Sequence, residues 1–277
     1  MKQLVYLIAV WACCLGAMRA LAGPESLPSG KEMKQVAQVV PECAYNWTGF
    51  YVGGFGGYVF GSADQHLNLG GTWARSPIAE RDLIESEAGH DLDANGGQAG
   101  GIVGYNYEWN KWVFGLEADG GYLWLRNSSH RDFEFGSAPF PNVFRLNSSF
   151  KSHYLVTMGP RIGYSFCRLM PYVTGGVAFG DVDHSQRLHE NFFLGSLEEH
   201  GSSSDTNVGW MIGGGLEYQL THHWRLRAQY RYADLGSSSF DSTGSGFVLI
   251  FPLIGYTAHH SIDLHEHTAD FGIVFAF

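Results

Sequence analysis

The sequence is poor in cysteine, in basic residues and in long apolar runs. Four of its 277 residues are cysteine, and 17 Lys and Arg stand against 27 Asp and Glu, for a formal net charge of −10. That charge repels nucleic acid, so no nucleic-acid partner is expected. Beyond residue 22 no run of 18 apolar residues occurs, which excludes a membrane-spanning helix. Long amphipathic helical stripes are also missing, so any membrane crossing must be made by strands.

The first residues carry the one sustained apolar run. Lys2 precedes this run, and Ala20-Leu21-Ala22 supplies the small residues of a secretory cleavage site. Residues 1–22 are therefore predicted to be a signal peptide. A lipoprotein signal that uses Cys13 or Cys14 is the alternative for this segment. Loss of the two basic residues of the signal leaves the mature chain with a formal net charge of −12.

Residues 23–45 contain three prolines among polar residues and show no sustained period. They are predicted to form a periplasmic tether, which leaves residues 46–277 as the folded domain. Two cysteines survive cleavage of the signal, Cys43 in the tether and Cys167 in the domain. In an oxidising compartment these two residues could form one disulfide that pins the tether, and two unpaired thiols are the alternative.

The domain is rich in glycine and aromatic residues and alternates in the way that strands do. Strands are expected near 47–61, 97–109, 112–126, 151–166, 171–184, 207–220, 224–238 and 263–277. Tight turns at 110–111, 167–170 and 221–223 alternate with long polar connections at 62–96, 127–150, 185–206 and 239–262. This pattern is typical of bacterial outer-membrane barrels, with the turns and both termini in the periplasm. The predicted fold class is all-β, an eight-stranded antiparallel up-and-down transmembrane β-barrel.

The side-chain alternation distinguishes a membrane barrel from a soluble lipocalin-type barrel, which would turn its apolar residues inward. In one strand, Trp224, Leu226, Ala228, Tyr230 and Tyr232 alternate with Arg225, Arg227, Gln229 and Arg231. One face suits lipid and the other carries charge. Aromatic residues also collect at the strand ends, as interfacial girdles require: Trp109, Trp112 and Trp224 near the turns, and Trp124 and Tyr154 near the long connections.

The C-terminal residues alternate in the same way. Phe271, Ile273, Phe275 and Phe277 fall on one side of the last strand, which is predicted to face lipid. This strand is expected to serve membrane insertion and to be the contact for the barrel-assembly machinery.

The inward face is predicted to hold equal numbers of acidic and basic residues. Strand parity turns Glu117, Asp119, Glu217 and Asp270 inward together with Arg161, Arg225, Arg227 and Arg231. A three-residue turn at 221–223 would place Glu217 opposite Arg227, with Asp119, Arg231 and Asp270 at one depth. An eight-stranded barrel is just filled by side chains, and charges buried there must be paired. The lumen is therefore predicted to be plugged by a ladder of ion pairs.

Four segments resemble a known family. They are Asn46 to Gly54 (NWTGFYVGG), Pro171 to Ala178 (PYVTGGVA), Gly213 to Tyr218 (GGGLEY) and Arg227 to Gly236 (RAQYRYADLG). They are similar to the small outer-membrane β-barrel proteins, porin-like surface proteins related in fold to the opacity proteins and the OmpA transmembrane domain. The resemblance spans Asn46 to Phe277 and implies an envelope or surface role without a defined catalytic set. The apolar run from Phe247 to Tyr256 departs from the pattern, and could extend a strand or add a hairpin.

The function expected from these features is that of an outer-membrane surface protein with envelope-structural and surface-interaction roles. Its partners would be outer-membrane lipid and an unknown extracellular partner of the loops. A small passive diffusion porin is the first alternative. A lipid-modifying hydrolase is the second, because His259 and Ser261 share one strand face and could form a nucleophile and its base.

Thirteen histidines include the pairs His222-His223 and His259-His260 and the alternating His265 and His267. A zinc site needs three or four converging ligands, and adjacent residues of a strand point to opposite faces. These histidines are therefore interpreted as rim residues. No metal, cofactor or catalytic activity is expected.

Overall fold

The computed structural model describes residues 46–277, apart from 90–91, 137–140 and 250. Residues 1–45 lie outside the described residues. The signal peptide (1–22), the tether (23–45) and the disulfide of Cys43 therefore stay predictions. In the part of the chain that is described, no helix is both long and apolar enough to span a membrane.

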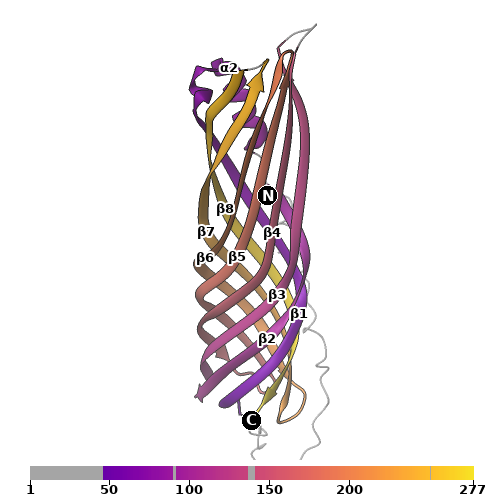
Figure 1. The fold of residues 1–277 in the computed structure, drawn as a ribbon. Helices are drawn as coiled ribbons and strands as arrows, with labels where there is room; N and C mark the ends of the chain where they lie inside the picture. Colours follow the sequence, from indigo (N-terminus) through magenta and orange to yellow (C-terminus); the bar gives the residue numbers. More distant parts are fainter. Residues whose placement is uncertain (1–45, 90–91, 137–140, 250) are drawn as a thin grey trace, which may run out of the picture. The chain divides into compact units, whose positions relative to one another are not determined.

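Eight antiparallel strands close into a barrel, as the sequence predicts (Figure 1). Each strand pairs with its chain neighbour, and β8 closes the ring on β1. The turn between β2 and β3 shows why the sequence folds so tightly there, since Asn110 and Lys111 have φ of 49° and 73°, as the primed hairpin turns require. The strands are β1 (Gly49–Gly71), β2 (Leu92–Trp109), β3 (Trp112–Phe135), β4 (Asn142–Tyr164), β5 (Leu169–Phe192), β6 (Gly195–Gln219), β7 (Trp224–Val248) and β8 (Phe251–Ala276).

The strands are much longer than the sequence predicts. They contain 18 to 26 residues, whereas a membrane crossing needs about 9–11. The prediction that 127–150, 185–206 and 239–262 are loops is wrong for most of their length, because the strands continue through them. In 62–96 the strands continue only at the two ends, and a short helical segment lies between them. Beyond the membrane both faces of a strand can be polar, as in Arg126 to Asp132 of β3, so the alternation that marks a lipid-facing strand disappears.

Bulges further obscure the side-chain alternation, because each extra residue changes whether the odd-numbered or the even-numbered side chains point inward. In β4 the buried residues are even-numbered up to Ser152 and odd-numbered from Leu155, across a register shift between Lys151 and Leu155. A similar shift separates Asp234 from Ser237 in β7.

A short helical segment joins β1 to β2 at the end of the barrel opposite the C-terminus (Figure 1). It comprises the 3-10 helix η1 (Thr72–Arg75) and the α-helix α2 (Ile78–Ala88). Apolar periodicity does not predict α2, because its buried face consists only of Glu80, Ile84 and Ala88. This segment closes the extracellular part of the barrel, where Trp73 and Ile84 pack in one apolar cluster with residues of β1, β4, β5, β6 and β8.

The apolar run Phe247 to Tyr256 extends two strands and adds no hairpin. Phe247 pairs with Pro252 and Val248 with Phe251 at the tip of β7 and β8. The count of eight strands is therefore confirmed.

The outer surface carries the apolar band that the parity predicts. Trp109, Trp112, Trp224, Trp124 and Tyr154 are all exposed. Phe271 and Ile273 of β8 and Phe277, the residue after it, are exposed, whereas Phe275 is half-buried and stacks on His223 with ring centroids 5.4 Å apart. The residues that are predicted to face lipid thus lie on the outer side of the barrel.

Candidate functional site

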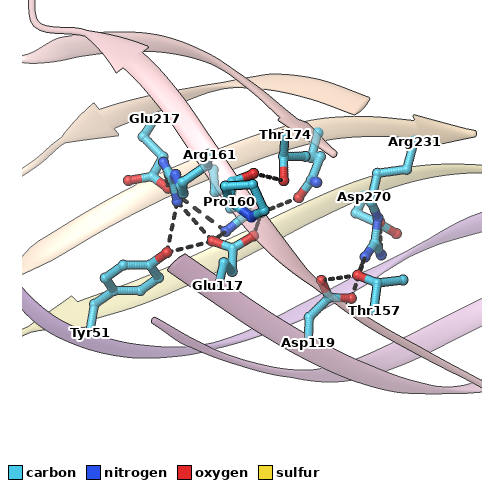
Figure 2. A network of polar contacts seen from close by, with 12 residues as sticks. Tyr51, Glu117, Asp119, Thr157, Pro160, Arg161, Thr174, Glu217, Arg231 and Asp270 are labelled. Atoms are coloured by element: carbon cyan, nitrogen blue, oxygen red, sulfur yellow. Dashed lines mark hydrogen bonds and ion pairs between the residues drawn. The ribbon is translucent and has the colours of Figure 1, made fainter. Parts of the chain in front are cut away.

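The inside of the barrel is the candidate site, because the eight charged residues predicted to face inward converge there. Near the periplasmic turns Glu117 of β3 is the centre of a hydrogen-bonded group (Figure 2). Its Oε2 accepts from the Tyr51 hydroxyl at 2.6 Å and from Arg161 Nη1 at 2.8 Å. Arg227 donates to both oxygens of the same carboxylate, at 2.6 and 2.5 Å. This bidentate contact is the strongest kind of Arg–carboxylate pair.

Glu217 of β6 is the second carboxylate of this layer, and its nearest cation is not the residue that the sequence predicts. The register does place Glu217 opposite Arg227. However, Glu217 Oε1 lies 2.7 Å from Arg161 Nη2 and 3.8 Å from Arg227 Nη1. Long arginine side chains reach past their strand neighbour in a narrow lumen, so Arg227 reaches Glu117 on β3 instead.

A second layer lies two residues further along β3, at Asp119. Arg231 pairs with Asp119 and, at 3.0 Å, with Asp270, so one guanidinium joins β3, β7 and β8 (Figure 2). Thr157 donates to Asp119 Oδ2 at 2.7 Å and accepts from Arg231 Nη1 at 3.1 Å. The predicted grouping of Asp119, Arg231 and Asp270 at one depth is present in the structure.

The charges balance over the two layers together and not within each of them. The lower layer holds Arg161, Arg225 and Arg227 against two glutamates, and the upper layer holds Arg231 against two aspartates. All eight predicted lumen residues are buried. An unpaired charge in a buried lumen is costly. The excess positive charge of the lower layer and the excess negative charge of the upper layer must therefore stabilise each other.

Aromatic rings complete the lower layer, and the sequence analysis did not identify them. Tyr172 lies under Arg161, with the guanidinium carbon 4.0 Å from the ring centroid, and Arg225 lies 4.6 Å from the Trp47 ring. Trp47 is completely buried, and its indole donates to the Cys167 carbonyl at 3.3 Å. A parity signal was available for Trp47, because it shares the inward face with Tyr51, Phe55 and Val59 at a spacing of four.

Apolar side chains fill the lumen above the charged layers. Leu123 and Leu125 follow Asp119 on the inward face of β3 and pack against residues from seven further strands, including Val59, Ala178 and Leu264. A second apolar cluster lies around Trp73 of η1, whose indole donates to Glu199 Oε2 at 2.9 Å. The lumen is therefore occupied by alternating polar and apolar layers along the described strands.

A polar layer containing two histidines separates the two apolar clusters. Burial lowers the pKa of His184 to about 4, an effect that the Gln186 side chain opposes. Burial lowers the pKa of His260 to about 4 as well, with a further contribution from the neighbouring His184. Phe240 stacks on His260 at 4.5 Å and lies 5.3 Å from His184. These imidazoles are held neutral in the folded barrel at neutral pH.

The residues of the hydrolase alternative do not form a catalytic pair. His259 Nδ1 contacts Asp241 at 2.8 Å, and no hydrogen bond to Ser261 occurs among the described residues. A different trio lies inside, where Ser242 Oγ contacts His260 Nε2 at 2.8 Å and donates to Glu199. In a Ser-His-acid triad the carboxylate orients the histidine, whereas here it contacts the serine, and all three side chains are buried.

The paired histidines also build no metal site in the described part of the chain. The structure instead brings together His153, Asp181 and Asp183 on the outer wall. These residues come from two strands and meet only because β4 bulges between Lys151 and Leu155, so no sequence pattern predicts the cluster.

Cys167, in the turn between β4 and β5, is disulfide-bonded. Its proposed partner Cys43 lies outside the described residues, so the pairing of the two stays a prediction.

A closed eight-stranded barrel with an apolar outer band, aromatic girdles and a charged interior defines an outer-membrane β-barrel protein. The profile of the outer membrane protein beta-barrel domain matches residues 33–275, so the chain belongs to this family. It is 24% identical to the 25 kDa outer-membrane immunogenic protein of Brucella abortus over 245 residues, which cover 88% of this chain and 91% of the relative.

A second relative and a solved structure lie in the same group. The 31 kDa outer-membrane immunogenic protein of Brucella melitensis is 29% identical, with 75% of this chain and 79% of the relative covered. The crystal structure of the outer membrane protein OprG from Pseudomonas aeruginosa matches with 14% identity and a TM-score of 0.38, and covers 84% of this chain and 99% of that one. The family match, together with the two relatives, identifies the protein as a surface protein of the bacterial outer membrane.

Proposed function

We propose that this barrel is a closed, non-conducting surface protein that has an envelope-structural role and presents a rigid extracellular wall for contact with a partner. The observation that carries the proposal is the filled lumen. Two charged layers and two apolar clusters follow one another along the inward faces of the strands. A conducting pore would need a continuous polar path, which the apolar layer around Leu123 and Leu264 interrupts.

The extracellular part supports the interaction role. The tips of the β5–β6 and β7–β8 hairpins lie side by side, because the Leu249 amide donates to the Leu194 carbonyl at 2.8 Å. Large apolar side chains are exposed at these tips: Phe193, Leu194, Phe247, Leu249 and Phe251. Contiguous exposed apolar side chains on a soluble surface mark contact sites. The relatives are named immunogenic outer-membrane proteins, which fits surface exposure of the equivalent regions.

The remaining partners follow from the outer face and the charge. The exposed Phe271, Ile273 and Phe277 suit contact with outer-membrane lipid and, during assembly, with the barrel-assembly machinery. The formal net charge of −10 disfavours nucleic acid. We assign no enzymatic activity and no cofactor, because the buried Ser242, His260 and Glu199 offer a substrate no access.

The interaction role is tested by cells that display the wild-type chain or a Phe193→Ser/Leu249→Ser variant. The variant is expected to lose adhesion to hydrocarbon droplets and to an apolar solid surface. Phe166→Ser is the matched control, since Phe166 is similarly exposed but belongs to a periplasmic turn. Equal adhesion of all three strains at equal surface display would overturn this role.

The porin alternative is tested separately by liposome swelling. Proteoliposomes that contain the folded barrel are expected to swell no faster in small sugars than empty liposomes. Swelling that rises with the amount of barrel would establish the diffusion porin and contradict the closed lumen.

A further inference from the structure

A polar cluster lies on the outer wall of the barrel, where β4 bulges against β5. His153 of β4 faces two aspartates of β5, with Nδ1 2.7 Å from Asp181 Oδ2 and 3.6 Å from Asp183 Oδ2. One donor atom from each of the three residues lies within 4.8 Å of the other two. Three residues of two ligand types that zinc accepts, imidazole and carboxylate, therefore converge at one point.

The bulge fixes this arrangement before any ligand arrives. Asp181 Oδ1 accepts from the backbone amides of both His153 and Tyr154, each at 2.7 Å. This contact satisfies the two amides that the bulge removes from the ladder, and it leaves Oδ2 of Asp181 aimed at the imidazole. Sites built on strands with their side chains held by further hydrogen bonds are preorganised for binding.

The proton on His153 does not account for the cluster. Nδ1 of an imidazole carries at most one proton and donates one hydrogen bond, yet two carboxylates approach it. With a neutral imidazole the cluster has a formal charge of −2, and with a protonated one it has −1. Lys151 lies opposite Asp183 in the register and supplies one positive charge nearby, but it offers no ligand atom to a metal ion.

We propose that His153, Asp181 and Asp183 bind Zn²⁺, which takes the place of the proton on Nδ1. In a tetrahedral site with metal–ligand bonds of about 2.0–2.2 Å, ligand atoms lie roughly 3.3 Å apart. The separations of 2.7 and 3.6 Å bracket this value. The side chains of His153 and Asp183 are 40% and 38% exposed, so the fourth position faces solvent and takes an exchangeable water.

The site lies at the edge of the apolar band. The Tyr122 ring lies 6.3 Å from the His153 ring, and the Tyr154 hydroxyl contacts Thr206 at 2.9 Å. Tyrosines in this position belong to the outer girdle, at the level of the lipid headgroups. A bound zinc would join β4 to β5 directly at the bulge, where their register is broken between Lys151 and Leu155. This inference does not depend on whether the lumen conducts.

The experiment is a Zn²⁺ titration of the untagged, folded full-length barrel in detergent, in competition with a chromophoric chelator. One site is expected, and Asp183→Asn should weaken it at least tenfold while leaving the Asp181 contacts to the bulge intact. His153→Gln should have the same effect. Lys151→Gln should tighten binding, since it removes a competing positive charge. Ca²⁺, which prefers oxygen ligands, should not displace Zn²⁺ at equal concentration.

Two controls separate this site from adventitious binding. Asp205→Asn removes a carboxylate of β6 that accepts hydrogen bonds from Ser203 and Ser238, and His259→Gln breaks a second exposed His–Asp pair, with Asp241. Both variants should bind one Zn²⁺ as the wild type does. Unchanged binding in Asp183→Asn and in His153→Gln, or an equal loss in the two controls, would overturn the proposal.

Discussion

Single residues in the lumen link several strands at once, including strands that are not neighbours. Glu117 on β3 receives hydrogen bonds from β1, β4 and β7 through Tyr51, Arg161 and Arg227. Each of these groups is buried, so each depends on the others to offset the loss of water. The consequence is that removal of one partner damages more than one contact.

We expect strong coupling between Glu117 and Arg227. Glu117→Ala or Arg227→Ala alone should lower the free energy of unfolding by roughly 3–5 kcal/mol, because each leaves an unpaired buried charge. The double variant should lose far less than the sum. The exposed pair Asp132–Arg145, at 3.3 Å, is the control cycle and should show coupling below about 1 kcal/mol. Additive losses at Glu117 and Arg227 in urea unfolding would contradict the hydrogen-bonded layer.

For Glu217 the structure changes the expected partner. Glu217→Ala should couple more strongly to Arg161→Ala than to Arg227→Ala, because the two ion-pair distances are 2.7 and 3.8 Å. Urea unfolding of the single and double variants measures both coupling energies and decides which arginine is the partner of Glu217. A larger coupling with Arg227, the residue opposite in the register, would show that strand pairing and not side-chain reach sets the ion pairs.

A glycine makes room for the aromatic ring of the lower layer. A Cβ at Gly215 would meet the backbone carbonyl oxygen of Ala228 first and would stand 2.7 Å from the Tyr172 hydroxyl oxygen. Gly215→Ala should therefore strain the pairing of β6 with β7 and force Tyr172 away from Arg161. We expect a loss of about 1–3 kcal/mol in the free energy of unfolding, as for other overpacked cores. Gly175→Ala is the control, because its Cβ would meet its nearest neighbour at 3.5 Å. Equal effects of the two substitutions would contradict this packing.

Each long strand has a membrane part and an extracellular part, and the side chains that point into the lumen differ between the two parts. The membrane part contains the charged layers, and the extracellular part contains His184 and His260 between apolar clusters. The pKa of both histidines is lowered to about 4, while the unfolded imidazole titrates near about 6.5. Protonation of these two histidines therefore favours unfolding of the extracellular part of the barrel. The stability of this part is lost as the pH falls from about 6.5 towards 4.

His184→Leu is expected to reduce this acid sensitivity. The two ring nitrogens of His184 have no well-aligned hydrogen-bond partner in the described structure, so the substitution removes little. The melting temperature of the variant should exceed that of the wild type, and by more at pH 4.5 than at pH 8. The pKa of Glu190 is raised to about 7 by burial and by Glu80, so this group lowers stability as the pH rises. Glu190 is present in both proteins and therefore does not change the difference between them. His130→Leu, at an exposed position, is the control. If the difference in melting temperature between His184→Leu and the wild type did not depend on pH, His184 would not be a source of the acid sensitivity.

The sequence predicts the membrane part of each element well and the extracellular part poorly, for a physical reason. Where lipid covers one face, as at Trp224 to Tyr232, side-chain alternation follows directly from the barrel geometry. Above the girdle water covers the outer face, so Arg126 to Asp132 lose the alternation although the strand continues. The bulge at Lys151 to Leu155 then shifts the parity, which also hides the meeting of His153 with Asp181.

The lumen residues could be predicted as a set, but their pairing could not. Parity alone turns all eight charged residues inward, and all eight are buried. Which guanidinium meets which carboxylate depends on side-chain reach across the barrel, as in Arg227 with Glu117. The contribution of Trp47 was available from parity, since it falls in phase with Tyr51 and Phe55.

At the scale of the whole molecule, the closed ring leaves no edge strand. The strands of the membrane part pair with both of their neighbours around the ring, and such closure makes a barrel resistant to detergent. Unboiled protein should therefore migrate differently from boiled protein in a denaturing gel. Equal mobility, together with a helical circular dichroism spectrum, would contradict the barrel.

Several independent layers are proposed to close the lumen, and single-channel recording in planar bilayers measures whether they do. The wild-type barrel is expected to give no steady open-channel current. Glu117→Ala should also remain silent, because the upper charged layer and the apolar cluster around Leu123 stay in place. A reproducible open-channel conductance from the folded wild-type barrel would contradict the account.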